Sequence, residues 1–190
     1  MIPFSNDIDK CLQILNSGGL ILYPTDTIWG IGCDATNEEA VAKIYALKLR
    51  VASKSMIILL AEERDILTYV TQPDLQIFNY IKGISKPVTV IYEGATAVAE
   101  NLIGEDGTIA IRVVNDEFCK HLINRFCKPI VSTSANISGY PPPLLFNDID
   151  AAIKSGVDYI VQHRQDDLYT AAPSAIIKWD KSGIPVIIRN

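Results

Sequence analysis

Residues 20–35 read LILYPTDTIWGIGCDA, and in this stretch a buried-looking strand stops abruptly. The four apolar residues at 20–23 are typical of a strand, and Pro24 ends its ladder because proline has no N–H to donate. Hydroxyl and carboxylate side chains follow at Thr25, Asp26 and Thr27. Because α/β sheets bind ligands beyond their strand ends, the stretch predicts a binding site there. A polar turn stabilised by Asp26 is the alternative interpretation.

Gly30 and Gly32 lie in the same stretch, and we expect them to allow a close approach of the backbone to another group. On both sides of residues 20–35, segments with apolar residues at helical spacing alternate with short apolar runs typical of strands. The chain ends in three strand-like segments. The last two, 174–180 and 184–190, predict a hairpin. We therefore expect an α/β fold in one domain over 1–190, with a twisted mixed parallel and antiparallel sheet and flanking helices.

Composition excludes several classes of protein. The chain has 190 residues, of which 48% are apolar and 21% charged, as in ordinary globular proteins. No apolar run reaches the roughly 18 residues of a membrane span, and the N-terminus has no signal-peptide pattern, so we expect a cytoplasmic protein without membrane contact. The net charge of −5 argues against a broad nucleic-acid-binding surface, although it leaves room for a local basic pocket.

The cysteines give two interpretations. Cys119, His121 and Cys127 lie close enough in sequence to suggest a metal site. However, the two cysteines also continue an apolar helical face with Phe118 and Leu122, and buried thiols are common in protein cores. We favour the core interpretation, and we expect no protein-held metal.

A basic cluster follows the second predicted helix. The segment ALKLRVASKSM at 46–56 places Lys48, Arg50 and Lys54 within seven residues. Three neighbouring cations suit a phosphate group, since arginine offers a planar fork and lysine a compact charge. A solvated helix end is the alternative, because basic side chains also favour that position.

A third polar stretch, IVSTSANISG at 130–139, follows two apolar strand residues. Its hydroxyl and amide side chains, with neighbouring backbone N–H groups, suit a triphosphate or a polarised carbonyl. A turn rich in serine and threonine would show the same pattern. The sequence contains no Walker motif and no GxGxxG, so neither a P-loop nor a Rossmann dinucleotide site is indicated.

Taken in order, PTDTIWGIGCDA, KLRVASK and STSANISG resemble the YrdC-like family of L-threonylcarbamoyladenylate synthases. PVTV, IAIRV and the terminal VIIR extend the similarity over nearly the whole chain. The chain departs from the family pattern at Val51, where proline is common, at Trp29, and at Ile84–Lys86, where many relatives have Trp-Pro-Gly.

The resemblance implies a concave basic groove in which ATP, L-threonine and bicarbonate form threonylcarbamoyl-AMP and pyrophosphate. Mg²⁺ would accompany the ATP, and a separate transferase complex would carry the product group to tRNA. By motif position, the residues near L-threonine would be Thr25, Arg112 and Ser174. Those near ATP would be Lys48, Arg50, Lys54, Ser132, Ser134, Asn136 and Arg189. No protein nucleophile is implied.

Two other functions stay open at this point. An RNA-binding module would use the same basic groove and would bind tRNA or double-stranded RNA in a salt-sensitive way without turnover. Weak tRNA binding could also accompany the synthase activity. A YciO-like relative would bind nucleotide without this activity, although the STSANISG motif favours the synthase branch.

Overall fold

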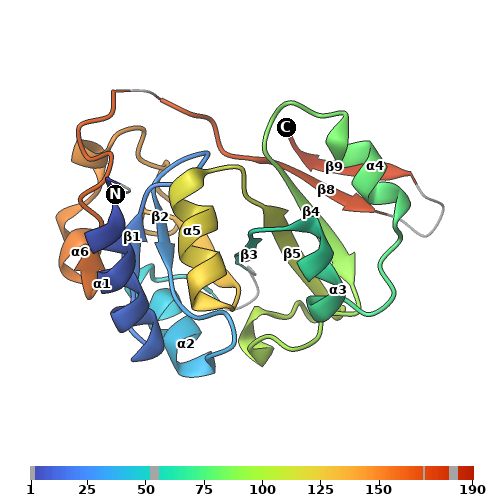
Figure 1. The fold of residues 1–190 in the computed structure, drawn as a ribbon, viewed down its shortest axis with the longest axis horizontal. Helices are drawn as coiled ribbons and strands as arrows, with labels where there is room; N and C mark the ends of the chain where they lie inside the picture. The colour runs from blue at the N-terminus through green and yellow to red at the C-terminus, as the bar shows by residue number, and fades with distance from the viewer. Residues whose placement is uncertain (1–2, 52–55, 169, 180–183) are drawn as a thin grey trace.

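The computed structural model describes residues 3–51, 56–168, 170–179 and 184–190. Their strands form a mixed sheet in the order β7-β1-β2-β6-β3-β5-β4-β8-β9. Among the described strands, three neighbouring pairs are parallel (β1 with β7, β3 with β5, β4 with β8) and the other five are antiparallel. The predicted α/β class, with a mixed sheet and flanking helices, is confirmed (Figure 1).

The elements follow the predicted order closely. The strands are β1 (Ile21–Tyr23), β2 (Gly30–Gly32), β3 (Ile57–Leu60), β4 (Val88–Glu93), β5 (Thr108–Val113), β6 (Ile130–Ser134), β7 (Tyr159–Ile160), β8 (Ala175–Trp179) and β9 (Pro185–Arg189). The α-helices are α1 (Ser5–Asn16), α2 (Glu38–Leu47), α3 (Ile66–Tyr69), α4 (Gln76–Lys82), α5 (Glu117–Phe126) and α6 (Ala151–Ser155). Short 3₁₀ turns cover Glu63–Asp65, Glu100–Leu102 and Phe146–Asp148. The antiparallel pairing of β8 with β9 confirms the predicted hairpin.

The strand register divides the sheet into two chemically different faces. Paired residues of neighbouring strands share a face, so the pairings define a row of side chains across the sheet. One such row is apolar and almost fully buried: Val131, Ile58, Ile111, Val90 and Ile177. This face belongs to the core, and α5 contacts it through β3. The opposite face carries the polar residues described in the next subsection.

Helices cover the sheet at both ends. Figure 1 shows α1, α2, α5 and α6 around β1 and β2, and α3 and α4 beside β4, β5 and β8. Helix α5 turns its apolar side to the core, including Cys119, whereas Cys127 lies beyond its end in a left-handed conformation and is exposed. The core interpretation is therefore right for Cys119 and wrong for Cys127. No cluster of three metal-ligating side chains occurs among the described residues. No helix in the same residues is long and apolar enough to cross a membrane.

Strand β2 is the element that sequence analysis missed. It consists of Gly30, Ile31 and Gly32, and it pairs with β1 on one side and β6 on the other. The expected close approach occurs against the protein itself: the Tyr23 ring lies over Gly32, and its hydroxyl donates to the Val131 carbonyl at 3.1 Å. Glycine is required there because a Cβ at Gly32 would lie 2.7 Å from both the Tyr23 ring and the Val131 carbonyl oxygen.

We expect Gly32→Ala to destabilise the protein by about 2 kcal/mol, because overpacking a filled core forces backbone shifts. The measurement is the free energy of unfolding in denaturant. Gly83→Ala is the matched control, since its Cβ would meet only the Tyr80 carbonyl oxygen at 3.5 Å. The control should change stability by less than ~0.5 kcal/mol. Equal effects of the two substitutions would contradict the packing argument.

Candidate active site

A cavity of about 340 Å³ opens on the polar face of the sheet. Three guanidinium groups line it, those of Arg50, Arg112 and Arg189, and no Asp or Glu is among the described residues of its wall. The hydroxyl-bearing residues of β6 form part of the same wall. Of the ten residues predicted for the site, the cavity brings together seven: Arg50, Arg112, Ser132, Ser134, Asn136, Ser174 and Arg189.

The strand register explains why residues so distant in sequence meet there. Ser134 pairs with Gly30, and Ser132 pairs with Ile57, which in turn pairs with Ala110 two positions before Arg112. All of these side chains therefore share the polar face. On the far side of β4, the pairing of Ile176 with Arg189 adds two further wall residues to that face. The sheet thus supplies described wall residues from six of its strands, β2, β3, β5, β6, β8 and β9.

Arg50 reaches the cavity through the way in which α2 ends. The Arg50 N–H donates to the Tyr45 carbonyl at 3.0 Å, the Leu49 N–H donates to the Ala46 carbonyl at 3.2 Å, and Leu49 is left-handed with φ 51°. This is the Schellman arrangement, which reverses the chain direction after a helix. It brings half-buried Arg50 back to the cavity wall, where burial lowers the pKa of its guanidinium.

Arg112 is the most deeply buried cation of the wall, with 3% of its surface exposed. Its Nη2 lies 3.1 Å from Oδ1 of Asp26, and its Nε has no hydrogen-bond partner among the described residues. Partial burial, and secondarily the nearby charge of Arg112, lower the pKa of Arg189. Three guanidinium groups in a described wall without Asp or Glu make the cavity positive, which suits an anionic ligand.

Ser174 and Arg189 are held together in the cavity wall. The Ser174 carbonyl accepts from Nε and Nη2 of Arg189 at 3.2 and 2.8 Å. The Ser174 hydroxyl lies 2.7 Å from that of Thr89, whose side chain is fully buried. Both contacts fix the segment that precedes β8, so Ser174 has a defined position on the wall.

Lys48 differs from its predicted placement as a direct phosphate ligand. The side chain is 1% exposed and is absent from the residues that line the cavity. Its ammonium instead donates to the carbonyls of Ser134 and Asn136, the latter at 2.6 Å. Burial, and to a lesser extent Arg50, lower the pKa of Lys48 to about 7. Lys48 thus supports the Ser134–Asn136 segment from behind, because carbonyls that face inward at the end of a strand need a donor.

Thr25 is also placed differently from the prediction, and Lys54 lies outside the described residues. The Thr25 hydroxyl is buried and bonded within its own turn: it donates to the Ile28 carbonyl at 2.8 Å and accepts from the Thr27 N–H at 3.0 Å. Thr27 and Ile28 line the cavity in its place. The Thr25 side chain therefore shapes the turn that carries the wall.

Sequence analysis missed several wall residues. Trp29 and Tyr140 line the cavity, and the Trp29 ring packs against Phe146 with 4.8 Å between ring centroids. Tyr140 lies in the proline-rich loop after β6. The Asn136 side chain donates a hydrogen bond to the Tyr140 carbonyl. Trp29 was visible only as an unusual residue in its motif, and Tyr140 had no signal in the sequence.

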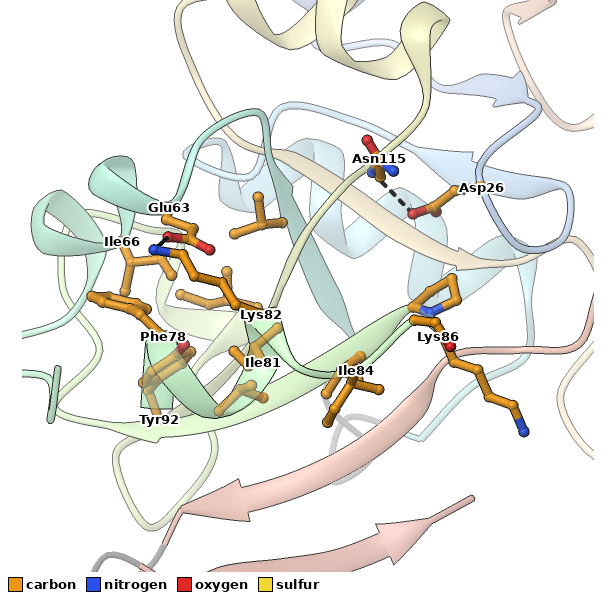
Figure 2. A pocket seen from close by; sticks show the side chains of 16 residues that line it. Asp26, Glu63, Ile66, Phe78, Ile81, Lys82, Ile84, Lys86, Tyr92 and Asn115 are labelled. Carbon is orange, nitrogen blue, oxygen red and sulfur yellow. Dashed lines mark hydrogen bonds and ion pairs between the residues drawn. The ribbon is translucent and has the colours of Figure 1, made fainter. Parts of the chain in front are cut away.

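A second cavity, of about 440 Å³, lies on the apolar face of the sheet (Figure 2). Its walls are largely aliphatic and aromatic, including Ile111 and Val113, whose side chains alternate with that of Arg112 along β5. Figure 2 shows the Glu63–Lys82 ion pair at one end and Asp26 beside Asn115 at another. Asp26 is thus in the wall of the second cavity while its carboxylate contacts Arg112 in the wall of the first.

Comparison with known proteins places this arrangement in a family. The Sua5, YciO and YrdC family model, described as telomere recombination, matches residues 13–190. A protein of Vibrio campbellii named threonylcarbamoyl-AMP synthase is 31% identical over 147 residues, which cover 76% of this chain and 80% of that protein.

Two solved structures share the fold. Sua5 of P. abyssi in complex with L-threonine has a TM-score of 0.84 at 24% identity, with 96% of this chain and 53% of that one covered. The present chain therefore spans about half the length of that protein. E. coli YciO has a TM-score of 0.83 at 21% identity, with coverage of 97% and 89%. With the match of the family model over nearly its whole length, the chain belongs to the Sua5/YciO/YrdC family.

Proposed function

We propose that the chain is an ATP-dependent synthase that forms L-threonylcarbamoyl-AMP from L-threonine, bicarbonate and ATP and releases pyrophosphate. The observation that carries the proposal is the cavity in which three arginines face a hydroxyl-lined strand end. A triphosphate and a carboxylate are the anions that such a wall would neutralise. The name of the curated relative, threonylcarbamoyl-AMP synthase, supports the same reaction.

We assign two groups of wall residues to the two substrates. Arg112 and Ser174 would hold the threonine carboxylate and hydroxyl, while Arg50, Arg189 and the β6 residues Ser132, Ser134 and Asn136 would hold ATP. Thr25 and Lys48 would not contact the substrates directly. Their polar atoms donate hydrogen bonds to backbone carbonyls of the segments that form the wall, so they would hold these segments in place. The assignment keeps the amino group of threonine free to react.

The reaction needs no protein nucleophile. The threonine amine attacks the carbon of bicarbonate, and loss of water leaves a carbamate. A carbamate oxygen then attacks the α-phosphorus of ATP, the bond between the α-phosphorus and the bridging oxygen breaks, and pyrophosphate leaves with the electron pair. Charge builds on the phosphoryl oxygens, so fixed guanidinium groups and the orientation of both reactants would supply most of the acceleration.

Magnesium belongs to the substrate in this proposal. The described wall has no carboxylate, and Asp26, the acidic side chain in contact with it, is paired with Arg112. This donor set does not fit a metal held by the protein. We therefore place Mg²⁺ on the phosphate oxygens of ATP, and no step is assigned to it.

The product is a mixed anhydride of a carbamic and a phosphoric acid, which water destroys. We propose that a tRNA-modifying transferase complex receives it, and that any direct contact of this chain with tRNA is weak. The cavity measures about 340 Å³ and is lined by strand residues and loops, a size that suits a nucleotide better than an RNA duplex.

The direct test supplies ATP, L-threonine, Mg²⁺ and ¹³C-labelled bicarbonate and follows the product by mass spectrometry. We expect threonylcarbamoyl-AMP that carries the ¹³C label, formed together with an equal amount of pyrophosphate. Reactions without bicarbonate, or with D-threonine, should give no product. Folded protein that binds ATP but yields no labelled product would refute the synthase and favour the YciO-like alternative.

A further inference from the structure

Asp26 links the two cavities on opposite faces of the sheet. Its side chain, 9% exposed, lies in the wall of the second cavity (Figure 2) and is absent from the wall of the first. Its Oδ1 is nevertheless 3.1 Å from Nη2 of Arg112, which lines the first cavity. Asp26 therefore contacts an active-site cation from behind, where a substrate in the first cavity would not reach it.

Asp26 is anchored independently of that contact. Its Oδ2 accepts a hydrogen bond at 3.1 Å from the N–H of Asn115, the second residue after the end of β5. The turn that carries it is held by Arg164, whose Nη1 donates to the Thr25 carbonyl and lies 3.1 Å from Asp116. Oδ1 has no hydrogen-bond partner among the described residues, so its contact with Arg112 is an ion pair. A carboxylate fixed in this way presents a stationary negative charge to the guanidinium.

Arg112 needs such a counter-charge. It shares the cavity with Arg50 and Arg189, and like charges favour rotamers that point away from one another. Its Nε–H has no acceptor among the described residues, so the ion pair with Asp26 is the contact that restrains the guanidinium in that part of the chain. We propose that Asp26 is a positioning residue that holds the Arg112 guanidinium in the orientation needed for the threonine carboxylate. The kinetic part of this inference rests on the proposed function.

The chain offers a matched control in the same motif. Asp34 is also a buried acid in an ion pair, with its Oδ2 2.7 Å from Nζ of Lys128, and it does not line the first cavity. Asp26→Asn and Asp34→Asn thus remove the same charge with the same change of shape. Asp26→Glu keeps the charge, and the adjoining second cavity has room for its additional methylene.

We expect Asp26→Asn to raise the KM for threonine about tenfold with a smaller change in kcat, since the Arg112 contact serves substrate and transition state alike. Asp34→Asn should leave the KM for threonine unchanged, and Asp26→Glu should restore most of the affinity. A purely structural role of Asp26 would lower the active fraction, hence kcat, without moving KM. An unchanged KM in Asp26→Asn, or an equal shift in Asp34→Asn, would overturn the proposal.

A second measurement is independent of turnover. In ¹⁵N-arginine-labelled protein, the Nε–H signal of Arg112, assigned by its loss in Arg112→Gln, should show a rigid side chain that becomes mobile in Asp26→Asn and stays rigid in Asp34→Asn. Equal rigidity in all three proteins would overturn the positioning role. If the wild-type protein makes no threonylcarbamoyl-AMP, the proposed function fails, and the NMR comparison still decides the role of Asp26.

Discussion

Arg112→Gln should reduce the formation of threonylcarbamoyl-AMP about 100-fold, the largest functional loss that we expect from one substitution. The guanidinium is 3% exposed and faces the cavity, so no solvent ion can replace it. The loss should fall mainly on the KM for threonine, because the side chain is assigned to the substrate carboxylate. Steady-state kinetics with varied threonine measure it.

The same substitution also leaves Asp26 as a buried charge without its partner. Removing one member of a buried ion pair costs about 3–5 kcal/mol of stability, so Arg112→Gln should unfold in less denaturant. The double variant with Asp26→Asn removes the isolated charge and should recover most of the stability but none of the activity. A well-folded double variant with activity within about threefold of the wild type would contradict the assignment of Arg112 to the substrate.

Lys48→Met should destabilise the protein by about 3 kcal/mol, because two buried carbonyls, those of Ser134 and Asn136, lose their shared donor. The same change should weaken ATP binding, since Ser134 and Asn136 line the cavity. Denaturant unfolding and calorimetric titration with a non-hydrolysable ATP analogue measure the two effects.

Lys43→Met is the matched control on the same helix. Lys43 is exposed and donates to a single carbonyl, that of Gly18 at 2.7 Å, so its loss should cost less than ~1 kcal/mol and leave ATP binding unchanged. Lys48→Met with normal stability and normal ATP affinity would show that the Ser134–Asn136 segment does not depend on the ammonium.

The titration of Lys48 gives a pH signature. Burial lowers its pKa from 10.5 to about 7, so between these values the unfolded chain holds a proton that the folded protein has released. Stability contributed by this group therefore rises with pH across that window. The free energy of unfolding of the wild type, relative to Lys48→Met, should increase from pH 7 to pH 10. An unchanged difference would contradict the lowered pKa.

Apolar patterning predicted most of the fold. The alternation along β5 and the apolar runs of β3, β4 and β6 are local signals, and a strand that buries one face has to show them. Strand β2 had no such signal, since two of its three residues are glycines. It is a strand because β1 and β6 satisfy its backbone groups, and pairing partners are not encoded within the segment itself.

The sequence by itself determined which chemical groups the site contains, because arginines and hydroxyls can be recognised wherever the chain places them. Only the tertiary structure decided which of them face the cavity. Lys48 and Asn136 are 88 residues apart, and their contact turned a predicted phosphate ligand into a support for the wall. The side of the sheet on which Asp26 meets Arg112 was decided in the same way, by packing between segments distant in sequence. Burial and pairing arise from the whole fold, and they separate the groups that can touch a substrate from those that hold them in place.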